Sequence, residues 1–583
     1  MSSLGATPTT KSRDVPDCDA VVVGSGPAGA TAAHVLTEAG WSVIVLEKGR
    51  NHLLSLEPPF GPAGEISNDE LKFMFRHFLG PDPLLEPRTF RRSERDGERL
   101  FTGDVNNLPS GVGGGGFHAD GKLPRFREID FRVRSELGPI DGADIVDWPI
   151  DYDELEPYYA EAERIVGVAG ETGTNPFAAW RSGPYPMPPG PDMYGAILSS
   201  EAATRLGYHP YRAPTGVNSV EYDGRPACNN CGFCGYFGCP IDAKGDPVAP
   251  LRRALGTGRC AVRPESHVSE VLLERTGRRA RGVRYLDADG AAHEVSADHV
   301  VLAAGAFETP RLLLRGGVGN SSDLVGRHLM FHFQTLVVGS FPLRLHGHRG
   351  RAVTHLHDDH MLITPESRAA AHTADLPYFR AGIVEHGGAA GPLMEAIHLP
   401  PGELHTKLML ESPLRDRMWV FTVQGEDLPQ PTNRVDLDPT VTDVWGFPAG
   451  RVTYSPHRHE VACSSFVAPQ LEAILREAGA DWTIATTSPP RDGAGAGALG
   501  LAPASRHVMG TCRMGEDPIA SVVDRWSRFH DVENMVCADS SVFPTSAGYG
   551  PTLTLVALAI RACRALAGQP PLRSRPPHDM IQP

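Results

Sequence analysis

The 583-residue chain contains no uninterrupted apolar run of the ~18 residues that a membrane-spanning helix requires. Its first 17 residues are polar and lack the apolar segment of a secretory signal, so we expect a disordered tail and a cytoplasmic protein. The chain also has no lysine-rich or arginine-rich tract, and its net charge is −15. A nucleic-acid partner is therefore not expected, because binding to phosphates needs a basic surface.

Four of the ten cysteines lie close together, at Cys228, Cys231, Cys234 and Cys239. Crowding of this kind in a chain without a signal segment favours reduced thiols or a metal site over a disulfide scaffold. The spacing is one residue longer than an iron–sulfur run before its last cysteine, whereas ribbon-type zinc sites separate their cysteine pairs by ~12–20 residues. An iron–sulfur cluster, zinc and a thiol-rich or disulfide-tied loop all stay open. We favour the loop and predict no metal ligand.

The segment from Cys18 to Gly49 has the pattern of a strand, a glycine-rich turn, a helix and a second strand. In the turn, Gly24 permits tight folding, Gly26 permits close approach of a pyrophosphate, and Gly29 permits packing of the helix on the strand. Glu47 follows Gly29 by about 18 positions, near the usual place of an acid that binds ribose. The segment therefore predicts a dinucleotide-binding unit, with an ordinary glycine-rich turn as the alternative.

A second glycine-rich stretch, Ser110 to Phe126, contains Gly114, His118 and Asp120. Backbone built from glycine can pass very close to a flat ligand. The alternative is a flexible linker, which the absence of serine-rich low complexity disfavours. We therefore expect this stretch to contact the ligand.

The remaining pattern predicts an α/β (α+β overall) protein with two domains. Residues 14–335 form a Rossmann-like domain with inserted loops, residues 336–504 form an antiparallel-sheet domain with helices, and residues 505–575 return to the first domain. Residues 51–100 are expected to be irregular, and one helix is expected near Phe466 to Glu477. His355, His357 and His360 resemble a metal cluster, but their polar surroundings favour surface histidines.

The C-terminal part contains three further features. His507 lies in the string HVMGTCRMG, and Asp539 ends an apolar strand. Pro551 suits the first position of a strongly apolar helix that we expect from Thr552 to Leu566. The N-terminus of a buried helix favours a negatively charged ligand, so we expect one there.

Together these strings resemble the glucose–methanol–choline (GMC) oxidoreductase family. The resemblance covers nearly the whole chain, through GSGPAG, GVGGGGFH, DWPIDYDELEPYY, AAGAFETPRLLL, DLVGRHLMFH, HVMGTCRMG, VCADSSVFPTS and PTLTLVALA. It implies bound FAD, a bipartite fold and oxidation of an alcohol by hydride transfer to flavin N5. The GGGGFHADGKLPRF segment most resembles the sugar-oxidising, pyranose oxidase-like branch, which favours a sugar, an amino sugar or another polyol as substrate, with oxygen or another carrier as electron acceptor.

The resemblance also implies roles for individual residues. His507 matches the catalytic base, and His118 matches a position that is joined to the flavin in several family members or otherwise lies beside it. The positions expected to bind FAD are Gly24, Gly26, Gly29, Glu47, Gly114, His118, Val268, Asp539, Pro551 and Thr552.

One departure from the family pattern concerns Gly550, where Asn or His usually stands as partner of the base. A water, Tyr549 or a group from the sheet domain then takes that place, or the chemistry differs. Two other functions therefore stay open. One is a lyase or isomerase that keeps FAD structurally, and the other is a dehydrogenase subunit that passes electrons through the cysteine segment.

Overall fold

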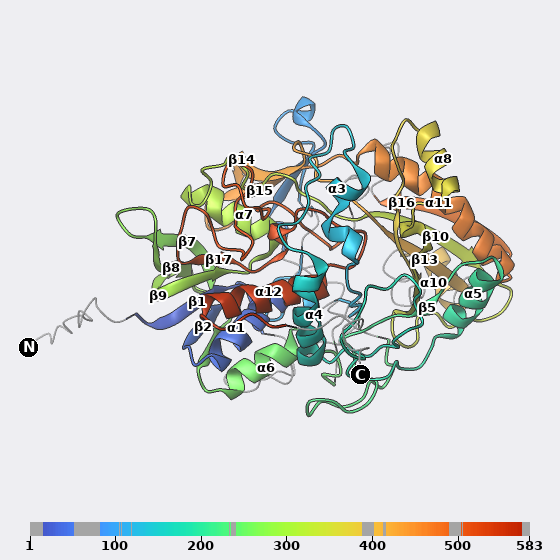
Figure 1. The fold of residues 1–583 in the computed structure, drawn as a ribbon, viewed down its shortest axis with the longest axis horizontal. Helices are drawn as coiled ribbons and strands as arrows, with labels where there is room; N and C mark the ends of the chain where they lie inside the picture. Colours follow the sequence, from blue (N-terminus) through green and yellow to red (C-terminus); the bar gives the residue numbers. More distant parts are fainter. Residues whose placement is uncertain are drawn as a thin grey trace, which may run out of the picture.

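The protein is described by a computed structural model (Figure 1). It describes residues 16–51 and 82–573, apart from 104, 106, 107, 118, 233, 235–238, 240, 246, 388–400, 412–415, 489–502 and 504. Mixed parallel and antiparallel sheets carry the fold, so the expected α/β (α+β overall) class is confirmed.

A seven-stranded sheet forms the first layer, in the order β6–β2–β1–β9–β8–β7 with β17 also paired to β9. Its strands β1 (Cys18–Val23), β2 (Val43–Leu46), β6 (Cys260–Arg263), β9 (Ala292–Leu302) and β17 (Met535–Cys537) are parallel. The start of β9 instead pairs antiparallel with β8 (Ala280–Leu286), which pairs with β7 (His267–Leu273). Strands β1 and β2 are almost fully buried, as their apolar β-branched runs require.

Helices cover this sheet, and two of them begin just after the carboxyl ends of parallel strands. Helix α1 (Pro27–Glu38) follows β1, and α12 (Thr552–Leu566) packs beside it. Helices α4 (Tyr152–Val166) and α6 (Val248–Gly256) complete that layer, and Figure 1 shows α1, α12, α4 and α6 on one side of the sheet. Helix α7 (Gly305–Gly316) follows β9 directly and packs on β7.

The second layer is a six-stranded antiparallel sheet in the order β16–β10–β13–β12–β11–β5. Its strands are β5 (Tyr211–Arg212), β10 (Phe333–Ser340), β11 (Val353–His357), β12 (Gly382–Gly387), β13 (Met418–Gly425) and β16 (Trp482–Ser488). Helices α11 (Arg458–Glu477) and α5 (Tyr194–Arg205) pack on it and bury apolar side chains such as Leu471 and Trp419.

A third sheet has the order β14–β15–β3–β4 and joins distant parts of the chain. It pairs β3 (Arg88–Arg91) and β4 (Phe101–Gly103) with the hairpin β14 (Arg434–Thr442) and β15 (Pro448–Thr453). The short helices α3 (Val133–Leu137), α8 (Pro365–Thr373) and α10 (Glu403–Glu411) complete the fold. Strand β5 comes from the segment 14–335 but pairs in the six-stranded sheet of the second domain. The domain boundary expected at residue 336 therefore stays a prediction.

Three local expectations need correction. Residues 82–103 are not wholly irregular, because they form β3 and β4, while residues 52–81 lie outside the described residues. Helix α11 begins at Arg458, eight residues before the predicted start, because its first turns bury the polar residues His459, Glu460 and Ser464, which an apolar pattern does not reveal. The histidines of THLHDDH are not at the surface, since His357 is fully buried and His360 is 9% exposed.

Candidate active site

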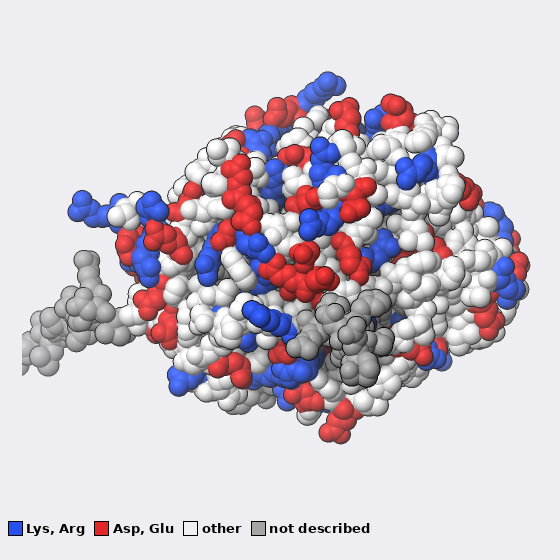
Figure 2. All heavy atoms as spheres, viewed as in Figure 1, with Lys and Arg blue, Asp and Glu red and all other residues white. Residues whose placement is uncertain are grey.

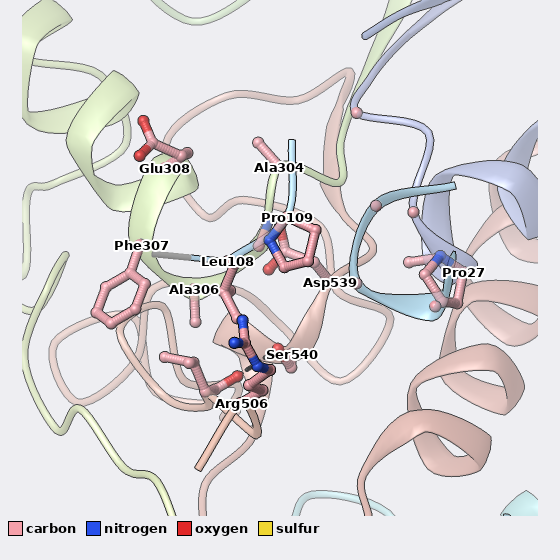
Figure 3. A pocket seen from close by; sticks show the side chains of 18 of the residues that line it. Pro27, Leu108, Pro109, Ala304, Ala306, Phe307, Glu308, Arg506, Asp539 and Ser540 are labelled. Carbon is pink, nitrogen blue, oxygen red and sulfur yellow. Dashed lines mark hydrogen bonds between the residues drawn. The ribbon is translucent and has the colours of Figure 1, made fainter. Parts of the chain in front are cut away.

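A cavity of about 660 Å³ lies between the carboxyl ends of the parallel strands and one face of the six-stranded sheet. The ends of parallel strands in an open sheet are the usual place for a ligand. Figure 3 shows Pro27 of α1 on one side and Ala304 and Phe307 at the start of α7 on the other, with Pro109 and Asp539 between them. Of the predicted site residues, the lining includes Gly24, Gly26, Glu47, Gly114, Val268, His507, Asp539, Pro551 and Thr552.

The glycines of the first turn differ in what surrounds them. A Cβ on Gly24, whose φ is +97°, would lie 2.5 Å from the Ala303 carbonyl oxygen, and one on Gly29 would lie 2.0 Å from the Gly24 oxygen. Both positions therefore need glycine for the protein's own packing. A Cβ on Gly26 would instead meet only the Gly114 Cα, at 4.0 Å. The open space at Gly26, where the α1 N-terminus faces the cavity, fits a pyrophosphate.

Glu47 lines the cavity at the end of β2 and is almost fully buried. Its carboxylate accepts hydrogen bonds from the backbone N–H of Ser25 at 3.0 Å, the Ser25 hydroxyl at 2.7 Å and the Gly49 N–H at 3.0 Å. Burial raises the pKa of Glu47, and these hydrogen bonds oppose that rise. An acceptor held at this edge is suited to bind the hydroxyl groups of a ribose.

Asp539 lies directly after β17 and joins two segments that border the cavity. Its carboxylate accepts hydrogen bonds from the Gly305 N–H at 2.9 Å and the Thr309 hydroxyl at 2.6 Å, at the start of α7. It also accepts one from the Ser541 N–H at 2.9 Å. The side chain thus fixes the α7 N-terminus beside the cavity (Figure 3).

The start of α12 meets the cavity through Pro551 and Thr552. Pro551 is the N-cap rather than the first helical residue, because the helix begins at Thr552. The N-terminal backbone groups of α12 therefore face the ligand space, as predicted for a helix that meets negative charge. Gly29 is not among the lining residues, and His118 lies outside the described residues.

The imidazole of His507 borders the cavity and contacts a second histidine that the sequence reasoning did not single out. Nδ1 of His507 lies 3.0 Å from Nδ1 of His332, and Nε2 of His332 lies 3.4 Å from the Ser546 carbonyl oxygen. Burial lowers the pKa of His507 well below its usual range, and the nearby His332 and Lys122 lower it further. Burial also lowers the pKa of His332 to about 4. Both rings are therefore neutral near pH 7.

The six-stranded sheet presents a polar face to the cavity that the sequence reasoning also missed. In the sheet register Gln334 of β10 pairs with Gln424 of β13, and Thr422 pairs with Glu385 of β12. All four side chains line the cavity, with Lys122 and Asp120 from the glycine-rich segment beside them. The period-two pattern of these strands was visible in the sequence, but which face turned inward was not.

This polar face is joined by hydrogen bonds and ion pairs. The Lys122 ammonium lies 2.6 Å from a Glu385 oxygen and 3.1 Å from an Asp120 oxygen. The Gln424 amide donates to Glu385 at 3.2 Å and accepts from the Gln334 amide at 3.3 Å. The wall therefore offers both donors and acceptors to a polar ligand.

Tyr549 does not line the cavity. Its ring is 1% exposed, and its hydroxyl donates to Asp358 at 3.0 Å. The hydroxyl is therefore engaged away from His507, and the suggestion that Tyr549 replaces the side chain missing at Gly550 finds no support in this geometry.

The cysteine segment lies outside the cavity lining. Among the described residues, no group of three or more His, Cys, Asp or Glu side chains is placed to hold a metal ion. Cys228, Cys234 and Cys239 form no disulfide, and burial raises the pKa of the Cys234 thiol to about 12.

Two observations concern the molecular surface. Within the described part of the chain, no helix is both long and apolar enough to cross a bilayer. Figure 2 shows basic and acidic side chains intermixed over the face in view, without a continuous basic patch on that face.

Comparisons with known proteins agree with the geometry. Two family models described as GMC oxidoreductase match residues 200–334 and 429–559, and a third, described as FAD binding domain, matches residues 17–54. The 2-methyl-1,2-propanediol dehydrogenase of Mycolicibacterium austroafricanum is 31% identical over 93% of this chain and 94% of its own. The paromamine 6'-oxidase of Streptomyces fradiae is 31% identical over 94% of this chain and 91% of its own.

Among solved structures, the pyridoxine 4-oxidase from Mesorbium loti has a TM-score of 0.61 at 18% identity, over 94% of this chain and 99% of its own, and so supports the fold. The expected family and the expected cofactor are thereby confirmed. The chain belongs to the GMC oxidoreductases, FAD-dependent enzymes that act on alcohol groups.

Proposed function

We propose that the chain oxidises a hydroxyl group of a sugar, an amino sugar or another polyol to a carbonyl, with His507 as the base. The observation that carries this proposal is the hydrogen-bonded chain from His507 through His332 to the Ser546 carbonyl. A carbonyl oxygen only accepts, so Nε2 of His332 carries the proton and its Nδ1 has the lone pair. His507 then donates from Nδ1, which leaves the lone pair of its Nε2 free to take a proton.

FAD, when bound, supplies the acceptor for the hydride that leaves the substrate carbon. The residues that would hold it are those along the cavity: Gly24, Gly26, Gly114, Glu47, Val268, Asp539, Pro551 and Thr552. Glu47 would bind ribose hydroxyls and Val268 would contact the adenine. The α12 N-terminus would stabilise negative charge on the reduced ring by roughly 0.3–2 kcal/mol. Gly29 serves indirectly, through packing of α1 on the turn.

The polar face of the six-stranded sheet supports a polyhydroxylated substrate. Its side chains bond to one another, but each amide and carboxylate has further donor or acceptor positions that those bonds do not use. A purely aliphatic alcohol would leave those positions unpaired, and an unpaired buried donor or acceptor costs about 1–3 kcal/mol. Gln334, Gln424 and Thr422 offer donors and acceptors that hydroxyl groups satisfy. The names of the two relatives, one acting on a diol and one on an amino sugar, agree with this class.

The test is reduction of the bound flavin by substrate in the absence of oxygen, measured as the loss of the flavin's visible absorbance. The panel consists of 2-methyl-1,2-propanediol, D-glucose, paromamine and 1-butanol. We expect one of the first three to reduce the flavin and 1-butanol to fail. His507→Ala should retain FAD but reduce it about 100- to 10,000-fold more slowly, the range for loss of a general base. A flavin that no polyol reduces would favour the lyase or isomerase alternative.

Two finer proposals concern the cofactor and the acceptor. We propose a covalent bond between His118 and FAD, and yellow colour left in solution after acid precipitation would contradict it.

Oxygen and an artificial acceptor, dichlorophenolindophenol, should be compared in turnover. A preference of more than tenfold for the dye would favour a carrier other than oxygen. An iron–sulfur absorbance in the purified protein would support the electron-transferring alternative.

A further inference from the structure

Position 550 faces the imidazole of the proposed base, yet it carries no side chain. A Cβ there would lie 3.8 Å from Cε1 of His507, 3.8 Å from the Lys122 carbonyl oxygen and 4.0 Å from Cδ of Pro124. These are ordinary contact distances, and the backbone of Gly550 is not in the left-handed region. Packing therefore does not require glycine at this position. The backbone of Lys122 lies next to the space that a side chain at position 550 would occupy.

Lys122 is a cation held inside the cavity wall. Its side chain is 12% exposed, and its ammonium contacts the carboxylates of Glu385 and Asp120, which are 7% and 30% exposed. An ammonium has three protons, and these two acceptors use two of them. Burial opposes the charge of Lys122, but the two carboxylates outweigh it and raise the pKa of this ammonium above its ordinary value. Among the residues that the structure describes, Lys122 has no third acceptor, so its third proton is available for a ligand in the cavity.

We propose that Lys122 is the second polar group acting on the oxidised oxygen, in place of the side chain absent at Gly550. Its backbone lies beside Gly550, its ammonium lines the same cavity as His507, and the two carboxylates limit how far it can move. The charge of Lys122 also acts on the His507 ring, which places the two groups in one electrostatic neighbourhood. The inference rests on the proposed oxidation.

The step that Lys122 assists is the loss of the hydroxyl proton. The proton passes to Nε2 of His507, and the carbon gives up a hydride, its two electrons and one proton, to the acceptor that FAD supplies. The O–H and C–H bonds break, and the C=O bond forms. Negative charge develops on the oxygen during this step, and a fixed ammonium that donates to it lowers the barrier.

Glu385 is a positioning residue for Lys122. One of its oxygens accepts from the ammonium, and the other accepts from the Gln424 amide, which is itself anchored by Gln334 on β10. The lysine is therefore tied to strands β12, β13 and β10 of the sheet. A substrate oxygen placed between the Lys122 ammonium and His507 would hydrogen-bond to both of them.

The experiment compares Lys122→Met, Lys122→Met/Glu385→Gln and Lys122→Met/Gly550→Asn in the FAD-loaded enzyme. The double variant with Glu385→Gln keeps the net charge of the cluster and removes the buried Glu385 carboxylate, so only the partly exposed Asp120 loses its lysine partner. It therefore separates loss of the donor from failure to fold. The probe is whichever of 2-methyl-1,2-propanediol, D-glucose and paromamine reduces wild-type flavin fastest. Stopped flow gives the limiting rate of reduction and the apparent dissociation constant of the probe.

We expect the first two variants to lose about 100- to 1,000-fold in limiting rate, the range for removal of one oxyanion donor. The dissociation constant should change by less than about fivefold. Gly550→Asn in the Lys122→Met background should restore about tenfold or more. A limiting rate near wild type, or a loss confined to the dissociation constant, would overturn the proposal, because Lys122 would then only bind a remote hydroxyl. If wild-type flavin is not reduced at all, the proposed oxidation itself fails.

Discussion

Nδ1 of His507 lies 3.0 Å from Nδ1 of His332, and the His332 ring is fully buried behind it. The two rings meet nearly at right angles, at 84°. A hydrogen bond between two such nitrogens requires one proton and one lone pair, so the protonation of one ring determines that of the other. The pair therefore acts as a unit that presents one defined nitrogen to the cavity.

The substitution His332→Phe tests whether His332 determines which nitrogen of His507 carries the proton. The phenyl ring fills similar space but removes the acceptor, so His507 is free to carry its proton on Nε2, where it cannot act as base. We expect anaerobic flavin reduction to slow by about 100-fold, with FAD still bound. His332→Gln keeps an acceptor and should stay within about tenfold of wild type. Equal rates for wild type and His332→Phe would show that His332 does not set the tautomer.

The pH dependence of flavin reduction follows from the same environment. Burial, together with His332 and Lys122, lowers the pKa of His507 well below the ordinary ~6.5 of histidine. A base with a lowered pKa is already neutral at pH 6, so its active form is not lost as the pH falls from 8 to 6. The limiting rate should be constant between pH 6 and 9. A rate that halves near pH 6.5 would mean that the titrating base is an ordinary, solvated histidine.

Gly26 and Gly29 should respond differently to substitution by valine. At Gly26 the added Cβ meets open cavity, so Gly26→Val should fold but lose FAD, because the side chain occupies the space of the pyrophosphate. At Gly29 the Cβ would lie 2.0 Å from a backbone oxygen, so Gly29→Val should lower the yield of folded protein. Flavin absorbance and circular dichroism distinguish the outcomes. A Gly26→Val protein with full flavin absorbance would exclude this turn as the cofactor site.

The N-terminal unit and the last helix could be predicted because their signals are local. The β1–α1–β2 segment has glycines, strand periodicity and a terminal acid within about 30 residues, and the apolar run starting at Thr552 gives α12 with the predicted bounds. In both cases side-chain pattern and backbone preference agree. Such agreement identifies an element without knowledge of its neighbours.

The substrate side of the cavity could not be predicted in the same way. Gln334, Glu385 and Gln424 are brought together only by the register of three strands that are distant in sequence. His332 was visible in the sequence, but its contact with His507 depends on how two separate segments meet. The histidines of THLHDDH appeared exposed because their neighbours are polar, yet His357 is buried against His386 of β12 and Phe421 of β13, and His360 is buried beside Tyr208. Tertiary packing, not local pattern, decides such positions.

The buried histidines of the six-stranded sheet form a separate group. Nδ1 of His357 lies 2.8 Å from Nε2 of His386, and Nδ1 of His386 lies 2.9 Å from the Ser199 hydroxyl. His360 packs nearby, with its ring centroid 5.5 Å from that of His357 and 5.4 Å from that of Tyr208. Burial lowers the pKa of His360 to about 4. It also lowers the pKa values of His357 and His386 well below 6.5.

These shifts predict that each of the three histidines removes stability from the folded protein as the pH falls below about 6.5. A histidine whose pKa is ~6.5 unfolded and about 4 folded binds protons in the unfolded state first. Its contribution is therefore complete above pH 6.5 and is lost as the pH falls toward 4, at up to about 1.4 kcal/mol per pH unit. Nε2 of His360 is buried without a hydrogen-bond partner among the described residues, so His360→Phe should keep the ring packing and remove one proton from this slope. Urea unfolding at pH 7.5, 6 and 5 measures the difference, with the exposed His372→Gln as control. If His360→Phe loses stability between pH 6 and 5 as steeply as wild type, His360 is not held neutral in the folded protein.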